Sequence, residues 1–204
     1  MKYFVFDTET TGLGQQDEVI QFAGYLLDDN FKFLTLHQFY CDTTVKINER
    51  ALETHKITHA MLKKFSRDVF FEDYFTELKP VLDTPDIVFV GYNVKFDIRL
   101  VNQTLTNQGY NAYDFGKKTT TLRNTKGRYY FDLMAALQNF KFGGKPVKLV
   151  NAVNTLLDVE HTNTIYDKIA NKLPYDSSMH YHSAIYDAFM TSALLQKYGN
   201  MFKV

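Results

Sequence analysis

The chain has 204 residues, of which 45% are hydrophobic and 16% aromatic. This composition supports one sizeable core and argues against an intrinsically disordered chain. The 23 basic and 23 acidic residues give a formal net charge of zero, which argues against a protein that tracks along duplex nucleic acid through its overall charge.

Cysteine content and the start of the chain indicate the compartment. Cys41 is the single cysteine, so it has no partner for an internal disulfide. The chain opens directly into a strand-like segment, without the charged start, apolar core and cleavage site of a signal peptide. No apolar run approaches the roughly 18 residues that a membrane helix needs. We therefore expect a cytoplasmic protein without a membrane segment, folded as a single domain over residues 1–204.

The first part of the chain is predicted to be mostly β-structure. Residues 2–6 are β-branched or aromatic and lead into a polar segment at 7–12. Two more strands are predicted at 19–27 and 31–41, with Asp28-Asp29-Asn30 as the hairpin between them. These three strands are expected to form a meander.

Helices and strands are then predicted to alternate. Helical periodicity covers 48–64 and 70–82, a buried strand follows at 87–90, and a helix at 97–108 ends at Gly109. The remaining predicted elements are a strand at 129–131, a helix from about Asp132, another near Val147, and a last helix from Ser183 to about Tyr198. This alternation predicts an α/β protein with a central mixed β-sheet flanked by α-helices.

Acidic residues at the predicted strand and helix ends form a pattern that suggests metal binding. Asp7 and Glu9 are two apart, so their side chains project from the same face of a strand. Their mutual repulsion would be relieved by a cation. Together with Asp97 and Asp187 they make a carboxylate set suited to Mg²⁺ or Mn²⁺. Two such ions about 3.5–4 Å apart can clamp a phosphodiester.

Each of these features also has a purely structural explanation. The segment at 7–12 could be a polar turn, Asp97 an ordinary acid at a helix N-terminus, and Asp187 a solvated acid on a helix surface. Taken singly, none of them establishes catalysis. Their joint occurrence in three separate segments, with a histidine at 182, favours the functional interpretation.

Three segments resemble the motifs of the 3'→5' exonucleases that carry four acids and one histidine, the DEDDh family. The first is Phe6–Leu13 (FDTETTGL), the second Gly91–Asp97 (GYNVKFD) and the third His182–Ala188 (HSAIYDA), followed by Thr191 and Leu194. A weaker similarity runs from Ile47 to Leu62, through Ala51, His55, Ile57 and Thr58. The resemblance covers nearly the whole chain and implies a ribonuclease H-like fold.

The spacing before the last aspartate distinguishes two groups of this family. A sister group has tyrosine four residues before it, whereas Ser183 stands there in this chain and His182 stands five residues before Asp187. Five helical residues span about 140° of rotation, so these two side chains cannot share one face of a continuous helix. Ser183 is a plausible N-cap that leaves His182 on the preceding loop. A histidine there could move over the site and accept a proton.

The resemblance implies a role for each motif residue. Asp7, Glu9, Asp97 and Asp187 would bind two divalent cations, Mg²⁺ or Mn²⁺, and His182 would be the general base. Residues matching Thr10 and Leu13 contact the terminal 3'-hydroxyl and the last base in relatives, and Asn93 and Phe96 match positions along the substrate groove. Each of three residues also has a structural alternative: Thr10 could cap a turn, Leu13 could pack beneath its loop, and Phe96 could belong to the core. The structural role is the favoured one for Leu13 and Phe96. Tyr92 stands where the family frequently has a histidine, so any substrate contact that this histidine makes in relatives is in doubt for this chain.

The resemblance also implies a substrate. We expect hydrolysis at the 3' end of single-stranded nucleic acid, with DNA favoured over RNA, release of nucleoside 5'-monophosphates, and a role in proofreading or repair. Association with a DNA polymerase is an open alternative, as is RNA 3'-end trimming, which depends on whether the groove accepts a 2'-hydroxyl. A non-catalytic module that binds nucleic acid or protein is disfavoured because every acid and the histidine are present.

A local basic segment is the best candidate for phosphate contact outside the motifs. Residues 116–128 hold five basic side chains and no acid: Lys117, Lys118, Arg123, Lys126 and Arg128. Its position between the second and third motifs suggests that it overhangs the site. A solvated hairpin is an equally good interpretation of the charge.

Overall fold

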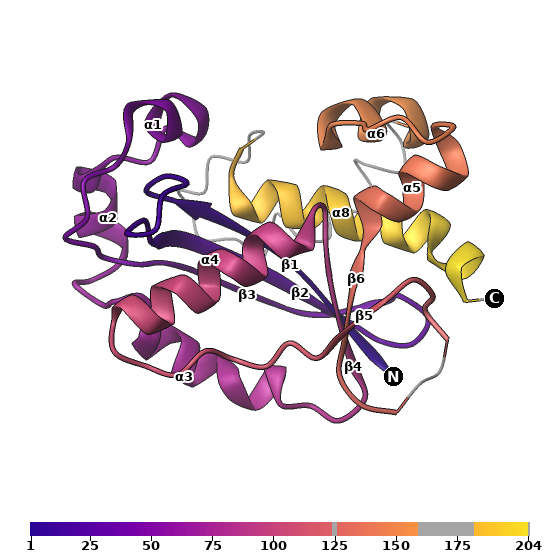
Figure 1. The fold of residues 1–204 in the computed structure, drawn as a ribbon, viewed down its shortest axis with the longest axis horizontal. Coiled ribbons are helices and arrows are strands. Elements are labelled where there is room, and N and C mark those ends of the chain that lie inside the picture. Colours follow the sequence, from indigo (N-terminus) through magenta and orange to yellow (C-terminus); the bar gives the residue numbers. More distant parts are fainter. Residues whose placement is uncertain (124–125, 159–181, 204) are drawn as a thin grey trace.

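A computed structural model describes residues 1–123, 126–158 and 182–203 of the chain. Within them, six strands form one mixed sheet in the order β3-β2-β1-β4-β6-β5 (Figure 1). The strands are β1 (Lys2–Thr10), β2 (Val19–Leu27), β3 (Phe33–Tyr40), β4 (Ile87–Gly91), β5 (Lys117–Thr119) and β6 (Tyr129–Asp132). β1, β2 and β3 pair antiparallel, which confirms the predicted meander, and β1, β4, β6 and β5 run parallel.

Helices cover both faces of the sheet, as the alternation predicted. They are α1 (Glu49–His55), α2 (His59–Phe65), α3 (Phe71–Leu82), α4 (Val94–Asn107), α5 (Leu133–Lys141), α6 (Leu149–Leu156) and α8 (Ala184–Tyr198), followed by the 3₁₀ turn η1 (Gly199–Phe202). Among the described residues, no helix is both long and apolar enough to cross a bilayer.

The alternation of side chains along β1 separates two cores. Tyr3 and Val5 pack with α5, α6 and α8, whereas Phe4 and Phe6 point the other way and pack with α3 and α4. Figure 1 shows α3 and α4 in magenta on one side of the sheet and α8 in yellow on the other. A third, smaller cluster around Ile20 and Leu62 holds α1 and α2 against the sheet.

Several element boundaries differ from the predictions. β1 continues through the polar segment as far as Thr10, because residues 7–10 pair with β2. The helix predicted at 48–64 is two helices, since Lys56 has a left-handed backbone (φ 61°) that ends α1, and Thr58 caps α2 by accepting a hydrogen bond from the Met61 amide. α4 begins at Val94 rather than near Asp97.

Parallel pairing determines where the motif segments meet. Val5 of β1 lies beside Val90 of β4, which lies beside Phe131 of β6. The carboxyl ends of these strands therefore share one edge of the sheet, where open α/β sheets commonly bind ligands. Asp7 and Glu9 lie just beyond this register on β1, and α4 starts directly after β4 at the same edge.

Candidate metal centre and substrate groove

β1 holds Asp7 and Glu9 side by side on the face that α8 covers. Asp7 pairs with Ala23 of β2, and Glu9 pairs with Gln21. The ladder shifts register between Glu9 and Thr10, which is where the strand leaves the sheet. A regular strand therefore fixes the two carboxylates, and both are partly buried.

α8 adds a third carboxylate from the other end of the sequence. Asp187 is in the first turn of this helix. Three carboxylate oxygens, one from each of Asp7, Glu9 and Asp187, lie within 4.8 Å of one another. The Oδ1 atom of Asp187 is buried and accepts no hydrogen bond. A buried carboxylate oxygen without a donor costs free energy unless a cation meets it, so the donor set fits a divalent ion.

Asp97 stands beside this group on the first turn of α4. Its side chain is 2% exposed, and its Oδ1 accepts hydrogen bonds from the amide (3.0 Å) and the hydroxyl (2.8 Å) of Thr8. It is not one of the three residues whose oxygens lie within 4.8 Å. Its charge nevertheless raises the pKa of both Asp7 and Glu9. The structure thus brings all four predicted acids together, three in one cluster and Asp97 next to it.

The pKa values of the four carboxyl groups reflect this crowding. Burial raises the pKa of Asp7 well above its ordinary value, and the charges of Asp97, Asp187 and Glu9 raise it further. The pKa of Glu9 is raised for the same reasons, with burial the largest. Burial raises the pKa of Asp97 and of Asp187 to about 7. Four acids that resist ionisation together are stabilised in their charged form by divalent cations.

His182 lies on the loop just before α8, where the spacing predicted it. Its side chain is exposed, and its backbone has a left-handed conformation with φ 64°. Its amide forms a hydrogen bond with the Asp187 carboxylate, which lowers the pKa of that group. Ser183 is the N-cap residue of α8, as predicted, although its side chain makes no capping hydrogen bond. His182 is therefore an exposed residue whose backbone adjoins the acid cluster.

Gln21 supports the start of α8 and was not singled out from the sequence. Its side chain is 1% exposed, and its Oε1 accepts a hydrogen bond (2.9 Å) from the Ala184 amide at the first residue of the helix. Because Gln21 also pairs with Glu9 across the sheet, it links the strand that carries two of the acids to the helix that carries Asp187. No sequence pattern reveals this role, since it depends on strand register.

A groove of about 530 Å³ opens beside Glu9. Three residues with predicted substrate roles line it, namely Thr10, Leu13 and Phe96. The expectation that Leu13 packs beneath its loop is wrong, because its side chain is 72% exposed. Phe96 is half-buried, so it contacts the core and the groove at once. The other wall comes from α1 and the residue before it, through Asn48, Arg50, Ala51, Thr54 and His55.

His55 fixes the backbone of the groove at Thr10. Its Nδ1 accepts a hydrogen bond from the Ile57 amide, so the proton of the neutral ring is on Nε2, which donates to the Thr10 carbonyl (3.1 Å). The Thr10 hydroxyl donates to the Gly12 carbonyl, which is the turn-capping contact considered as its structural role. The resemblance at 47–62 contained His55 but gave it no function.

Asn93 and Tyr92 have structural partners outside the groove. Asn93 precedes α4 with a left-handed backbone (φ 71°), and its amide donates to the Asp132 carboxylate. It is not among the residues that line the groove beside Glu9. The Tyr92 hydroxyl donates to the Val147 carbonyl.

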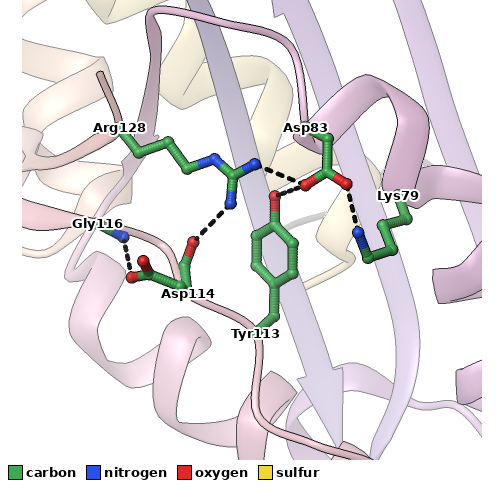
Figure 2. Close-up of polar contacts among 6 residues, drawn as sticks. All are labelled: Lys79, Asp83, Tyr113, Asp114, Gly116 and Arg128. Carbon is green, nitrogen blue, oxygen red and sulfur yellow. Dashed lines mark hydrogen bonds and ion pairs between the residues drawn. The ribbon is translucent and has the colours of Figure 1, made fainter. Parts of the chain in front are cut away.

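The two ends of the basic segment at 116–128 do not overhang the acid cluster as expected. Lys117 and Arg128 lie at the start of β5 and just before β6, the opposite end of these parallel strands from Asp132. Arg128 forms an ion pair with Asp83 (2.7 Å) and donates to the Asp114 carbonyl. Figure 2 shows Asp83 at the centre of this network, with Lys79 and Tyr113 as its other donors. Arg128 therefore ties loops together at the far end of the sheet.

Solved structures of exonuclease I have the same fold. The *E. coli* enzyme in its zinc-bound complex with single-stranded DNA matches with a TM-score of 0.69 and 19% sequence identity, over 98% of this chain and 40% of that chain. The exonuclease I of *Methylocaldum szegediense* matches with a TM-score of 0.65 and 19% identity, over 98% and 40%. These matches confirm the expected ribonuclease H-like fold.

Similar sequences are found within much larger proteins. DNA polymerase III of the PolC type from *Staphylococcus haemolyticus* is 26% identical over 182 residues, and that from *Staphylococcus aureus* is 27% identical over 188 residues. Each alignment covers 84% of this chain and 11% of the polymerase, so the chain spans about a tenth of the length of these relatives. The family model RNase_T, described as an exonuclease, matches residues 4–195. The chain therefore belongs to the RNase_T exonuclease family.

Proposed function

We propose that this chain, as one exonuclease domain, hydrolyses the terminal phosphodiester at the 3' end of single-stranded DNA and releases nucleoside 5'-monophosphates. The observation that carries the proposal is the meeting of Asp7, Glu9 and Asp187 within 4.8 Å, with Asp97 beside them. This geometry supports a metal centre, and the groove next to Glu9 supports access of a DNA end to it.

Each site residue has one task in this proposal. Asp7, Glu9, Asp97 and Asp187 would hold two divalent cations, Mg²⁺ or Mn²⁺, which when bound stabilise the negative charge that develops on the phosphate. His182 accepts the proton of the attacking water at a ring nitrogen, a task that suits an exposed imidazole on a loop. Thr10 contacts the terminal 3'-hydroxyl, Leu13 packs against the last base, and Phe96 contacts the strand further along the groove. Asn93, which is exposed outside the groove lining, would contact the strand only beyond the groove.

The relatives support DNA as the substrate. The *E. coli* exonuclease I of similar fold has been solved with single-stranded DNA, and the similar sequences are parts of DNA polymerase III. We infer from the second group that the chain acts in proofreading or repair, in association with a DNA polymerase. The zero net charge suits short contacts at a strand end better than tracking along a duplex.

The direct test is digestion of matched single-stranded DNA and RNA oligomers, each labelled at its 5' end, with Mg²⁺, Mn²⁺ or EDTA. The proposal predicts stepwise shortening from the 3' end in the metal lanes alone, with DNA degraded faster than RNA. Asp7→Asn, which keeps the side-chain shape and removes the charge, should abolish cleavage. Asp73→Asn, an exposed acid on α3, is the matched control and should leave cleavage unchanged.

Two results would redirect the proposal. Faster digestion of RNA than of DNA would assign the chain to RNA 3'-end trimming. Binding of either polymer without cleavage, by folded protein with metal present, would mean a nucleic-acid-binding module instead of an enzyme.

A further inference from the structure

Leu13 is held at the groove by a loop with its own internal scaffold. The loop runs from Gly12 to Asp17, and the Asp17 carboxylate accepts hydrogen bonds from the Thr11 hydroxyl (2.8 Å) and the Gly14 amide. A Cβ atom on Gly12 would lie 2.6 Å from Asp17 Oδ2, so a larger residue there would push the Asp17 carboxylate out of its position in the loop. The loop therefore has a defined shape although Leu13 is 72% exposed.

A glutamine on α4 fastens this loop to the rest of the protein. The Nε2 amide of Gln103 donates to the Gly14 carbonyl (2.8 Å) and to the Asp17 carbonyl (2.6 Å). Both protons of the side-chain amide are thereby used on the backbone of the loop. Gln103 is thus a clamp between α4 and the segment that presents Leu13.

Arg99 sets the orientation of that amide. Its guanidinium donates to Gln103 Oε1 (3.2 Å), so the NH₂ group of Gln103 faces the loop. The same guanidinium lies 5.4 Å from the ring centroid of Phe96, which also lines the groove. Phe96, Arg99 and Gln103 are three and four residues apart and so follow one another along one side of α4. Two groove side chains, Phe96 and Leu13, are therefore connected through Arg99 and Gln103.

We propose that Gln103 is a positioning residue for substrate, oriented by Arg99, which holds Leu13 in place at the groove before the DNA end arrives. This inference deepens the proposed function and rests on it, because it concerns the same groove. An apolar side chain that is already ordered binds a terminal base without the entropy cost of fixing a loop, so the benefit falls on substrate affinity. The acid cluster is not touched by Gln103, and the chemical step should not depend on it.

The test compares two variants of Gln103 with a matched control. Gln103→Glu keeps the shape but cannot donate to the two carbonyls, and Gln103→Ala removes the group. Asn102→Ala is the control, because Asn102 is the preceding residue of α4 and its side chain also makes two hydrogen bonds to backbone, donating to the Tyr113 carbonyl and accepting from the Tyr113 amide. Affinity for a fluorescent single-stranded DNA oligomer is measured by anisotropy in EDTA, and KM and kcat are measured with Mn²⁺.

We expect both Gln103 variants to raise Kd and KM about tenfold with kcat changed less than twofold, and Asn102→Ala to leave all three unchanged. Leu13→Ala should raise Kd similarly, and adding Gln103→Ala to it should have less than a twofold further effect, because both act on one contact. Unchanged Kd in folded Gln103 variants, or effects that multiply in the double variant, would overturn the inference. A wild type that binds DNA but does not cut it would count against the proposed function, while the ratio of Kd values would still decide on Gln103.

Discussion

Asp97 and Asp187 keep their protons near neutral pH in the metal-free protein, because burial raises the pKa of each group from 3.8 to about 7. Between these two pH values the folded chain retains protons that the unfolded chain has released. The free energy of unfolding must therefore fall as pH rises through this range. The stabilising contribution is complete below about pH 4 and is lost once pH passes about 7.

Metal and pH should therefore act together on the stability of the protein. Thermal unfolding in EDTA should show a midpoint that falls by several degrees between pH 5 and about pH 8, and Mn²⁺ should raise the midpoint most at the higher pH. Asp187→Asn removes one of the titrating groups and should flatten the slope in EDTA. A slope that is identical in wild type and Asp187→Asn would show that this acid does not titrate as described.

The proposed general-base role of His182 depends on its imidazole ring alone. His182→Gln should lower kcat by about 10²- to 10⁴-fold through loss of the general base, while Mn²⁺ binding is retained. His59→Gln, a second exposed histidine at the start of α2, is the matched control and should have wild-type kcat. Rates for His182→Gln that equal the wild type at every pH would remove His182 from the mechanism.

At the scale of elements, Gln21 joins β2 to the first turn of α8. Gln21→Ala removes the acceptor of the Ala184 amide, and this end of the helix should then open more readily. We expect amide exchange at the start of α8 to be about tenfold faster or more, together with lower exonuclease activity. Hydrogen exchange followed by mass spectrometry measures the first effect.

The control for this prediction lies at the other end of the same helix. Gln196 donates to the Phe31 carbonyl, and Gln196→Ala should speed exchange only near the C-terminus of α8. Equal exchange at the start of α8 in wild type and Gln21→Ala would mean that other contacts hold the helix in place.

Asp83 connects three segments at the opposite end of the sheet. It accepts hydrogen bonds from Lys79 of α3, from Tyr113 and from Arg128, and these donors lower its pKa, with Lys79 the largest influence (Figure 2). Asp83→Ala should destabilise the fold by about 1–2 kcal/mol, because the pairs are partly exposed and so individually weak. Urea denaturation tests this value, with Asp73→Asn as the control, and unchanged DNA cleavage by the folded variant is expected.

On the scale of the whole molecule, the approximate positions of five of the six strands and the meander of the first three followed from local patterns, whereas β5 and the order of the strands in the sheet did not. Alternating or continuous apolar runs predicted β2 at 19–27, as observed, and the last helix within one residue of its start. The shared strand face expected for Asp7 and Glu9 is confirmed, but the end of β1 was placed too early, because Asp, Thr and Gly favour turns and the pairing with β2 overrides that preference as far as Thr10. The break between α1 and α2 at Lys56 was also missed, since nothing about lysine signals a left-handed backbone.

Some residues of the site could be identified from the sequence, and others are recognised only from tertiary contacts. Asp7, Glu9, Asp97 and Asp187 were identified because their residue types and order carry the chemistry. Gln21, His55 and Gln103 were not given roles, because each acts through a backbone group that is distant in sequence or set by register. The basic segment at 116–128 was expected to overhang the site because it lies between the second and third motifs, and position in the sequence does not determine which end of a strand Lys117 or Arg128 occupies.

Whether these four acids form a metal centre can be tested by counting the ions that the protein binds. Mn²⁺ can be titrated against the protein in the presence of a nucleoside 5'-monophosphate and followed by electron paramagnetic resonance. We expect two Mn²⁺ ions per wild-type chain, loss of one or both ions in Asp7→Asn and in Asp187→Asn, and no change in Asp73→Asn. If the folded wild type binds no Mn²⁺ at millimolar concentration, or if Asp7→Asn and Asp187→Asn bind Mn²⁺ as well as the wild type, the four acids are not a metal centre.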